Sequence, residues 1–263
     1  MQGLAEAYYT SRIIKASALI ADTKALLVAW DSDTSTRQNL NRLRQENIFG
    51  KTSRSRAHAV LRIFRQRYFD RPEVGATLVA LVQNSTMPQW VDPLLYFFTA
   101  QNDRTLHDIV VDTLYTRKQT GYIDLPVVVV QNALRNWVNE GKTTSHWSEA
   151  TIARVTRNAL ATLRDFGVLG GAAHKHLSPI YLPLQSFSLI AFWLMQELQS
   201  GNRVLRSDEW RLFFLDVSSV ERNFLEAHQE GLLSYHAAGS VVRLEFPAGS
   251  LKDYADELIK RTS

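Results

Sequence analysis

The stretch that decides the fold is TSRSRAHAVLRIFRQRYF, residues 52–69. It contains neither glycine nor proline, and it opens with Thr52 and Ser53, residue types that cap the first turn of a helix. Four apolar side chains follow one another at helical spacing: Ala57, Leu61, Phe64 and Tyr68. The spacing predicts an amphipathic helix whose apolar face enters a protein core.

The neighbouring face of the same helix is basic. At 3.6 residues per turn, four side chains fall within about 80° of one another: Arg54, His58, Arg62 and Arg65. A positive stripe of about three turns can follow the phosphates of a nucleic acid. His58 can equally be a surface residue that happens to lie in line with the arginines.

Basic residues are concentrated around this helix. Residues 37–71 hold ten lysines and arginines against two acids, a net charge of +8, whereas the whole chain carries +4 and the remainder therefore −4. Such asymmetry is typical of a site for a polyanion, although basic helices also occur as ordinary solvated faces.

Length and composition predict a folded protein with more than one packed unit. The chain has 263 residues, of which 45% are hydrophobic and 21% charged, close to the average for globular proteins. It lacks cysteine, which excludes disulfides, and its first residues do not have the pattern of a signal peptide, so we expect a cytoplasmic protein. The most apolar windows, residues 92–100 and 188–198, are shorter than the roughly 20 residues of a membrane span, so we expect core helices and no membrane contact.

The middle of the chain predicts a helix–turn–helix followed by a wing. A helix that begins near residue 124 is followed by a polar turn at 139–145 and a second helix from Ser148 to Phe166. The apolar face of the second helix comprises Ile152, Val155, Ala159, Leu163 and Phe166. Its opposite face carries three candidates for DNA contact, namely Arg154, Arg157 and Asn158. Gly167 suits the end of this helix, and a basic stretch that includes Lys175 precedes a β-like segment at 177–183.

The same order recurs near the C-terminus. Helices are expected at 186–199, 207–214 and 216–230, and Gly231 ends the last of them. Two alternating runs, LLSYHA and SVVRLEF, then predict a β-hairpin of the kind that forms a wing. In the third helix the residues expected to face inward are Val217, Val220, Phe224 and Ala227, and those expected to read DNA are Ser218, Ser219, Arg222 and Asn223.

Acidic residues make this second module the weaker DNA candidate. Glu221, Glu226 and Glu230 leave the surface of its third helix roughly neutral. Winged helices also serve as protein-docking modules, so their fold alone does not establish DNA contact.

The predicted fold class is mainly α: a multi-helix body with winged-helix-like modules that carry small β-hairpin wings. Between residues 71 and 118, Pro72, Pro88 and Pro93 stand at plausible first turns of short helices. The predicted domains are a helical N-terminal domain with the basic helix (1–120), a helix–turn–helix or winged-helix-like module (121–185) and a C-terminal winged-helix-like module (186–263).

No motif for catalysis or cofactor binding is present in the sequence. Phosphate-binding, dinucleotide-binding, zinc-protease and esterase signatures are all missing. The histidine pair His174 and His176 has no further ligand nearby in sequence to complete a metal site. We therefore expect no enzyme activity, metal, cofactor or small-molecule substrate, although a metal-dependent nuclease could use dispersed acids.

The segment QENIFGKTSRSRAHAVLRIFRQRY, residues 45–68, resembles the BrxA family, the small component of BREX anti-phage defence systems in bacteria. Further anchors are the early Tyr8, Tyr9 and Thr10, the helix at 110–118, and the Ser148 and Thr151 start of the helix that ends before Gly167–Leu169. The resemblance covers roughly residues 8–200, and the remaining C-terminal residues match no pattern of the family.

The resemblance implies a helical DNA-binding protein without a known enzymatic role, a fold that has been compared with NusB-type RNA-binding proteins. It also implies that the protein acts together with a methyltransferase, an ATPase, a phosphatase-like protein and a protease-like protein. The basic positions that match the family are Lys51, Arg54, Arg56, Arg62 and Arg65, which include the arginines of the stripe.

The sequence therefore predicts a non-enzymatic accessory protein of BREX phage defence that binds double-stranded DNA mainly through phosphates. The alternative is a scaffold whose winged helices dock other BREX subunits. RNA binding comes third, because no aromatic-rich RNA platform supports it.

Overall fold

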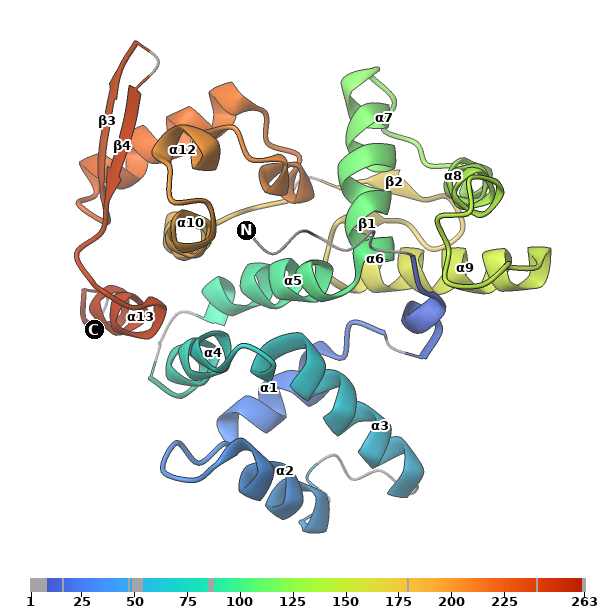
Figure 1. Cartoon of the computed structure of the whole chain (residues 1–263), viewed down its shortest axis with the longest axis horizontal. Coiled ribbons are helices and arrows are strands. Elements are labelled where there is room, and N and C mark those ends of the chain that lie inside the picture. The colour runs from blue at the N-terminus through green and yellow to red at the C-terminus, as the bar shows by residue number, and fades with distance from the viewer. Residues whose placement is uncertain are drawn as a thin grey trace. The chain divides into compact units, whose positions relative to one another are not determined.

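A computed structural model of the chain describes residues 9–15, 17–46, 48, 54–84, 88–178, 180–239 and 241–261. The fold is mainly helical and carries two small antiparallel hairpins, as predicted (Figure 1). Contacts divide the chain into two compact units. The first comprises Met1–Ala18, Thr99–Ile180 and Arg211–Phe214, and the second comprises Leu19–Phe98, Tyr181–Trp210 and Leu215–Ser263. The domain boundaries 1–120, 121–185 and 186–263 stay a prediction.

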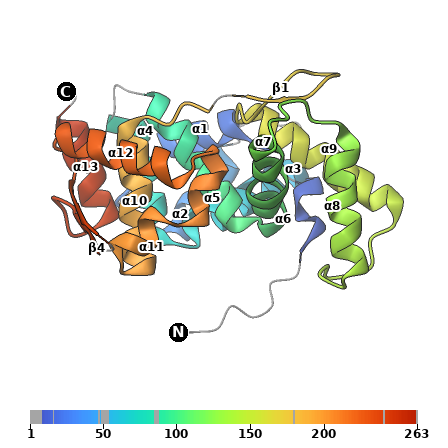
Figure 2. The same ribbon diagram turned by 90° about the horizontal axis from the view of Figure 1, so that it is seen from above.

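The first unit is built on one broken helix and a helical hairpin. The broken helix runs through α6 (Arg104–Asp108), the π-helical turn η4 (Ile109–Leu114) and α7 (Tyr115–Gln119). The remaining elements are the 3₁₀ helix η1 (Ser11–Lys15), α8 (Val127–Asn139), α9 (Glu149–Asp165), β1 (Leu169–Gly170) and β2 (His176–Leu177). In Figure 2, α8 lies beside α9, and both pack within this unit.

The connection between α7 and α8 adds a third extended segment to the first hairpin. The backbone N–H of Leu125 donates to the carbonyl of Lys175 at 2.8 Å, and the N–H of Leu177 donates to that of Ile123 at 2.8 Å. Asp124 and His176 are thus bridged antiparallel, while β2 pairs with β1 on its other side. The order in this unit is helix, extended segment, helix, helix and hairpin.

The second unit combines the N-terminal helices with the C-terminal part of the chain. Its N-terminal elements are α1 (Ile20–Val28), α2 (Thr36–Gln45), α3 (Arg54–Phe64), the π-helical turn η2 (Arg65–Phe69), α4 (Pro72–Asn84) and the 3₁₀ turn η3 (Pro88–Trp90). Its C-terminal elements are α10 (Leu184–Leu198), α11 (Gly201–Leu205), α12 (Val217–Gln229), β3 (Ser234–Ala238), β4 (Val241–Glu245) and α13 (Leu251–Lys260). Two elements, α5 (Val91–Asn102) and the 3₁₀ helix η5 (Asp208–Phe213), cross from one unit to the other.

Aromatic side chains form the core of this second unit. The ring of Phe187 in α10 stacks on Trp210 at 4.6 Å between centroids, and the ring of Phe224 in α12 meets Phe187 at 4.8 Å. The helix α4 packs along α13, and the hairpin packs on α11 and α12 (Figures 1 and 2). Burial of these large rings supplies much of the driving force for packing the C-terminal helices together.

The apolar faces predicted from the sequence are largely confirmed. Ala57, Leu61, Phe64 and Tyr68 are all buried, although the predicted start of their helix at residues 52 and 53 lies outside the described residues. The windows at 92–100 and 188–198 belong to α5 and α10, and most of their side chains are buried. Gly167 and Gly231 follow helices with φ of 77° and 67°, the conformation that glycine adopts most easily.

Two local predictions were wrong. Val217 was expected to face inward, but it is 41% exposed because it occupies the first position of α12, at the edge of the arc that contains the buried Val220, Phe224 and Ala227. Among the described residues of the β-like segment at 177–183, which omit residue 179, only Leu177 lies in a strand. Pro183 cannot donate to a ladder, because proline has no backbone N–H.

Because α11 lies close to the hairpin of β3 and β4, we expect that Gly201 cannot be replaced by a larger residue without loss of stability. A Cβ at this position would collide with the carbonyl oxygen of Val242 in β4, so Gly201→Ala should lower the free energy of unfolding by about 1–3 kcal/mol. Gly249→Ala is the matched control, since no atom lies within 4 Å of its Cβ position. Thermal denaturation compares the variants, and equal losses at the two glycines would contradict the close approach.

Candidate nucleic-acid interface

The α3 surface, defined as the exposed basic side chains of α2, α3 and η2, belongs to the second unit. Arg56, His58, Arg62 and Arg65 are exposed. Lys51 lies outside the described residues, and Arg54 begins α3 without a description of its side chain. Arg62 forms no hydrogen bond or ion pair within the described part of the chain, so its guanidinium is available to an external anion.

Contacts within this surface change the role of two predicted residues. The Nη1 atom of Arg44 lies 3.0 Å from Nε2 of His58, so the histidine can accept a hydrogen bond from the guanidinium and hold it beside the stripe. Arg65 pairs loosely with Asp70, at 3.6 Å between Nε and Oδ1. Arg44 was not among the site residues predicted from sequence, because it lies on a different helix. Its basic charge within residues 37–71 was the signal that could have identified it.

Arg67 shows that not every arginine in this region belongs to the surface. Arg67 is only 7% exposed, whereas Arg62 and Arg65, on the outer side of the continuous helix formed by α3 and η2, are exposed. The local net charge of the sequence therefore overstates the charge that the surface presents.

The α9 surface, the second predicted interface, lies in the first unit. The hydroxyl of Ser148 caps α9 by accepting from the N–H of Thr151, which fixes where the helix begins. Its inner face buries Ile152, Val155, Ala159 and Leu163, and its outer face exposes Arg154 and Arg157. The Nδ2 of Asn158 donates to the carbonyl of Arg154 at 2.8 Å, so its side-chain carbonyl oxygen remains for an outside donor.

An ion pair joins α9 to the preceding helix. The guanidinium of Arg135 on α8 donates to Glu149 through Nε and Nη2, both at 2.9 Å. Hydrogen bonding by Arg135 lowers the pKa of the Glu149 carboxyl. The pair occupies the carboxylate at the start of α9. Farther along the helix, Arg154 and Arg157 are exposed, and Arg164 pairs with the neighbouring Asp165 at the end.

The first hairpin carries the predicted wing residue. Lys175 is half-exposed, and its Nζ donates to the carbonyl of Ala172 at 3.0 Å. Gly171 has a φ of 79°, and a Cβ there would collide with the carbonyl of His174, so the turn requires glycine. His174 and Lys175 lie in the turn of this hairpin, which follows α9 along the chain.

A buried carboxylate anchors the N-terminal segment to this unit. The hydroxyl of Tyr9 donates to Asp108 at 2.8 Å, and Arg104 donates to the same oxygen at 2.9 Å. Nδ1 of His107 lies 2.6 Å from the other oxygen. The ring of Tyr9 also stacks on Trp137 of α8 at 3.9 Å between centroids. Tyr9 therefore links the broken helix to the helical hairpin that presents α9.

Backbone hydrogen bonds extend the anchor to the turn before α9. The N–H of Tyr9 donates to the carbonyl of Lys142 at 2.8 Å, and its carbonyl accepts from Thr144 at 3.0 Å. Burial disfavours ionisation of Asp108, but hydrogen bonds from His107, Tyr9 and Arg104 outweigh it and lower the pKa of the carboxyl. Burial, reinforced by the bond to Asp108, raises the pKa of the Tyr9 hydroxyl.

The α12 surface carries the remaining predicted residues and differs in character. Ser218 and Arg222 are exposed, whereas Ser219 and Asn223 are half-exposed. Asp216 caps the helix, accepting from the N–H of Ser219 at 2.8 Å and from the Ser218 hydroxyl at 2.9 Å. These bonds lower the pKa of Asp216 and commit the Ser218 hydroxyl to the cap.

Apolar and acidic groups share the α12 surface. Leu225 is 47% exposed. Glu221 accepts a hydrogen bond from the hydroxyl of Tyr235 in β3 at 3.0 Å, and burial together with this bond raises the pKa of Tyr235 to about 12. Positive charge is thus gathered on α3 and α9 rather than on α12.

Neither a metal centre nor a membrane span is found in the described part of the chain. Among the residues described, no three histidine or acidic side chains group as ligands for an ion. Within the same residues, no helix combines the length and apolar composition that crossing a bilayer requires.

The fold and these surfaces define a mainly helical protein with exposed arginines on the outer faces of two amphipathic helices, α3 and α9. The model of the BrxA family matches residues 7–192, most of the chain. The chain belongs to the BrxA family, which indicates an accessory component of a BREX defence system and is not a known enzyme family. The predicted resemblance is confirmed.

Among solved structures with a similar fold is the crystal structure of an uncharacterized protein from Magnetospirillum magneticum, with 14% sequence identity and a TM-score of 0.57. The similarity covers 78% of this chain and 98% of that one, and at this identity it shows the fold alone. No curated protein matches the chain.

The Tyr9 anchor predicts a measurable loss of stability on removal of one oxygen atom. Tyr9→Phe keeps the stack on Trp137 but removes a donor from the buried Asp108, which should cost about 1–3 kcal/mol. Tyr122→Phe is the control, because that ring is 60% exposed and its change should cost less than about 0.5 kcal/mol. Chemical denaturation measures both, and similar small losses would contradict the anchor.

The lowered pKa of Asp108 predicts how the stability of this unit depends on pH. A carboxyl whose pKa is lower in the folded state stabilises the fold above its unfolded pKa of about 3.9, and this contribution is lost as the pH falls through the folded pKa. The destabilisation caused by Asp108→Asn should therefore be largest near neutral pH and shrink below about pH 4. Denaturation at several pH values measures it, and a pH-independent difference would contradict the lowered pKa.

Proposed function

We propose that this protein is a non-enzymatic accessory factor of a BREX system that binds double-stranded DNA. The observation that carries the proposal is the exposed basic run of the α3 surface, where Arg62 of α3 and Arg65 of η2 point outward while the opposite face is buried. Arginine side chains on one helix face can contact successive phosphates without reading the base sequence. The proposed binding is therefore tolerant of sequence and sensitive to salt.

We propose α9 as a second DNA contact, in a winged-helix module. Support comes from the element order in the first unit and from the pairing of residues 123–125 with β2, since winged helices place an extended segment between their first two helices. In such a module α9 would enter the major groove through Arg154, Arg157 and Asn158, and Lys175 on the hairpin would contact the backbone. On α12, Arg222 and Asn223 would make minor contacts with DNA. Ser218 and Ser219 would contribute less, because the hydroxyl of Ser218 and the backbone N–H of Ser219 already donate to Asp216.

A docking role is the second candidate function. The observation that favours it is the α12 surface, where Leu225 is exposed among acidic side chains. An apolar group on a charged helix suits a protein partner better than a phosphate backbone. Other BREX subunits are the proposed partners, and a pull-down from nuclease-treated extract would retain them only if DNA does not bridge the contact.

The phosphate-contact proposal is tested by removing charge from α3. The double variant Arg62→Gln, Arg65→Gln should weaken binding to a duplex of random sequence. It should also lower the slope of log affinity against log salt by about 0.9 for each phosphate that the protein no longer neutralises. Fluorescence anisotropy over a series of salt concentrations gives both quantities, and single-stranded DNA and RNA serve as competitors.

The matched control for this test is Arg203→Gln with Arg206→Gln. These arginines are also exposed and three residues apart, but they lie at α11, outside the proposed interface. The control variant should keep the salt slope of the unmodified protein. An unchanged slope in the α3 variant, or an equal loss in both, would reject this surface, and the same measurement on Arg154→Gln with Arg157→Gln tests α9 separately.

A further inference from the structure

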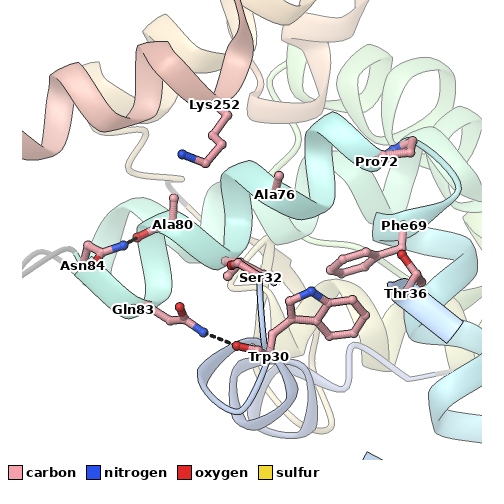
Figure 3. A pocket seen from close by; sticks show the side chains of 11 residues that line it. Trp30, Ser32, Thr36, Phe69, Pro72, Ala76, Ala80, Gln83, Asn84 and Lys252 are labelled. Carbon is pink, nitrogen blue, oxygen red and sulfur yellow. Dashed lines mark hydrogen bonds between the residues drawn. The ribbon is translucent and has the colours of Figure 1, made fainter. Parts of the chain in front are cut away.

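A pocket of about 490 Å³ opens in the second unit (Figure 3). Its lining comes from the connection between α1 and α2, the start of α2, η2, α4 and the first turn of α13: Trp30, Ser32, Thr36, Phe69, Pro72, Ala76, Val79, Ala80, Gln83, Asn84 and Lys252. The volume lies within the range of roughly 300–1,000 Å³ that small-molecule sites occupy. Nothing in the proposed DNA binding uses this pocket.

One side of the pocket is apolar and largely preformed. The rings of Trp30 and Phe69 lie 4.0 Å apart between centroids, and both residues are less than a tenth exposed. On α4, Ala76 and Ala80 contribute short side chains to the lining (Figure 3). The apolar part of the lining is therefore made by two packed rings and two alanines.

A glutamine holds the aromatic wall in place. Nε2 of Gln83 donates to three carbonyls at the end of α1, those of Leu27 at 3.0 Å, Val28 at 3.2 Å and Trp30 at 2.8 Å. The backbone that carries the indole is thereby tied to α4. Preorganisation of this kind lowers the entropy that a ligand must lose on binding.

The polar groups of the pocket include both donors and acceptors. The amide nitrogens of Gln83 and Asn84 are bonded to backbone carbonyls, so their side-chain oxygens are the acceptors of the lining. Within the described part of the chain, the indole N–H of Trp30 and the hydroxyls of Ser32 and Thr36 form no hydrogen bond. Lys252 adds an ammonium group, which is paired with Asp256 at 2.7 Å on the exposed side of α13. Lys252 is the one charged residue among those described in the lining, and an ammonium group beside the free N–H of Trp30 and the two hydroxyls favours an acceptor that carries negative charge.

We propose that this pocket binds a small ligand that combines a planar apolar ring with an oxyanion, either a phosphate or a carboxylate. The ring would pack against Trp30, Phe69 and Ala76, and the oxyanion would accept from Lys252 and the free donors. Trp30 and Phe69 also contact Phe64, at 5.7 and 5.0 Å between ring centroids, so the ligand would bind against the core that supports α3.

The test is ligand-observed NMR with the full-length protein in the absence of DNA. Phenyl phosphate and benzoate each carry a ring and one type of oxyanion, while phenol and inorganic phosphate supply the parts separately. Binding of phenyl phosphate or benzoate, stronger than that of either part, is the expected result, and the stronger of the two identifies the oxyanion. Absence of binding by both at millimolar concentration overturns the proposal.

Two pairs of variants assign the binding to this pocket. Ala76→Leu fills it and should abolish binding, whereas Ala133→Leu, at a half-exposed position of α8, should have no effect. Lys252→Gln should weaken binding about tenfold, and Lys260→Gln, which removes another exposed, ion-paired lysine of α13, should leave it unchanged. Binding that survives Ala76→Leu, or that falls equally in both lysine variants, overturns the proposal. Because no DNA is present, neither result depends on the proposed DNA binding.

Discussion

The packing of Phe64 against Trp30 and Phe69 is the interaction on which the α3 surface depends. Phe64 is 1% exposed, and its ring lies 5.0 Å from Phe69 and 5.7 Å from Trp30. A helix with one buried face has only one rotational setting, so burial of Phe64 directs Arg62 and Arg65 outward. The positions of the charges therefore follow from aromatic packing, because exposed arginines gain little from their own contacts.

In the first unit, a buried polar cluster around Asp108 helps to fix the helices that carry the exposed arginines of α9. Asp108 is 5% exposed and accepts from Tyr9, Arg104 and His107, which together compensate for its burial. Removing one donor from such a network costs more than a typical surface hydrogen bond, because the buried carboxylate remains. The orientation of α8 and α9 thus depends on a tyrosine more than a hundred residues earlier in the chain.

The sequence correctly predicted which segments are helices and which helix faces are buried. It did not predict which residues from elsewhere in the chain pack against those faces. The periodicity of Ala57, Leu61, Phe64 and Tyr68 identified a buried face, because the 3.6-residue repeat is a property of the helix itself. The same repeat does not say what covers that face, so neither Trp30 nor the pocket beside it could be predicted. The prediction that Val217 faces inward was wrong for a related reason, since the first turn of a helix can extend beyond the element that covers the remaining turns.

For the surface residues, too, exposure could be predicted from the sequence, whereas contacts with other elements could not. The exposure of Arg62, Arg154 and Arg157 follows from their helical phase. The contact of Arg44 with His58 joins two helices, and the use of the Ser218 hydroxyl by Asp216 depends on where α12 begins. Charge counting could not separate Arg67, which is buried, from its exposed neighbours. Sequence reasoning therefore located the basic helix more reliably than it assigned roles to single side chains.

The packing of α13 on α4 shows why the C-terminal part of the chain cannot be treated as an appendage. The family match ends at residue 192, within α10, yet α13 packs along α4, which lies inside the matched region (Figure 1). On α13, Leu251, Tyr254, Ala255 and Leu258 are buried, and the hydroxyl of Tyr254 donates to the carbonyl of Leu232 at 2.8 Å. Burial of a full helix face on each side is worth several kcal/mol, comparable with the stability of a whole domain. The α3 surface therefore rests on a core to which residues beyond the family match contribute.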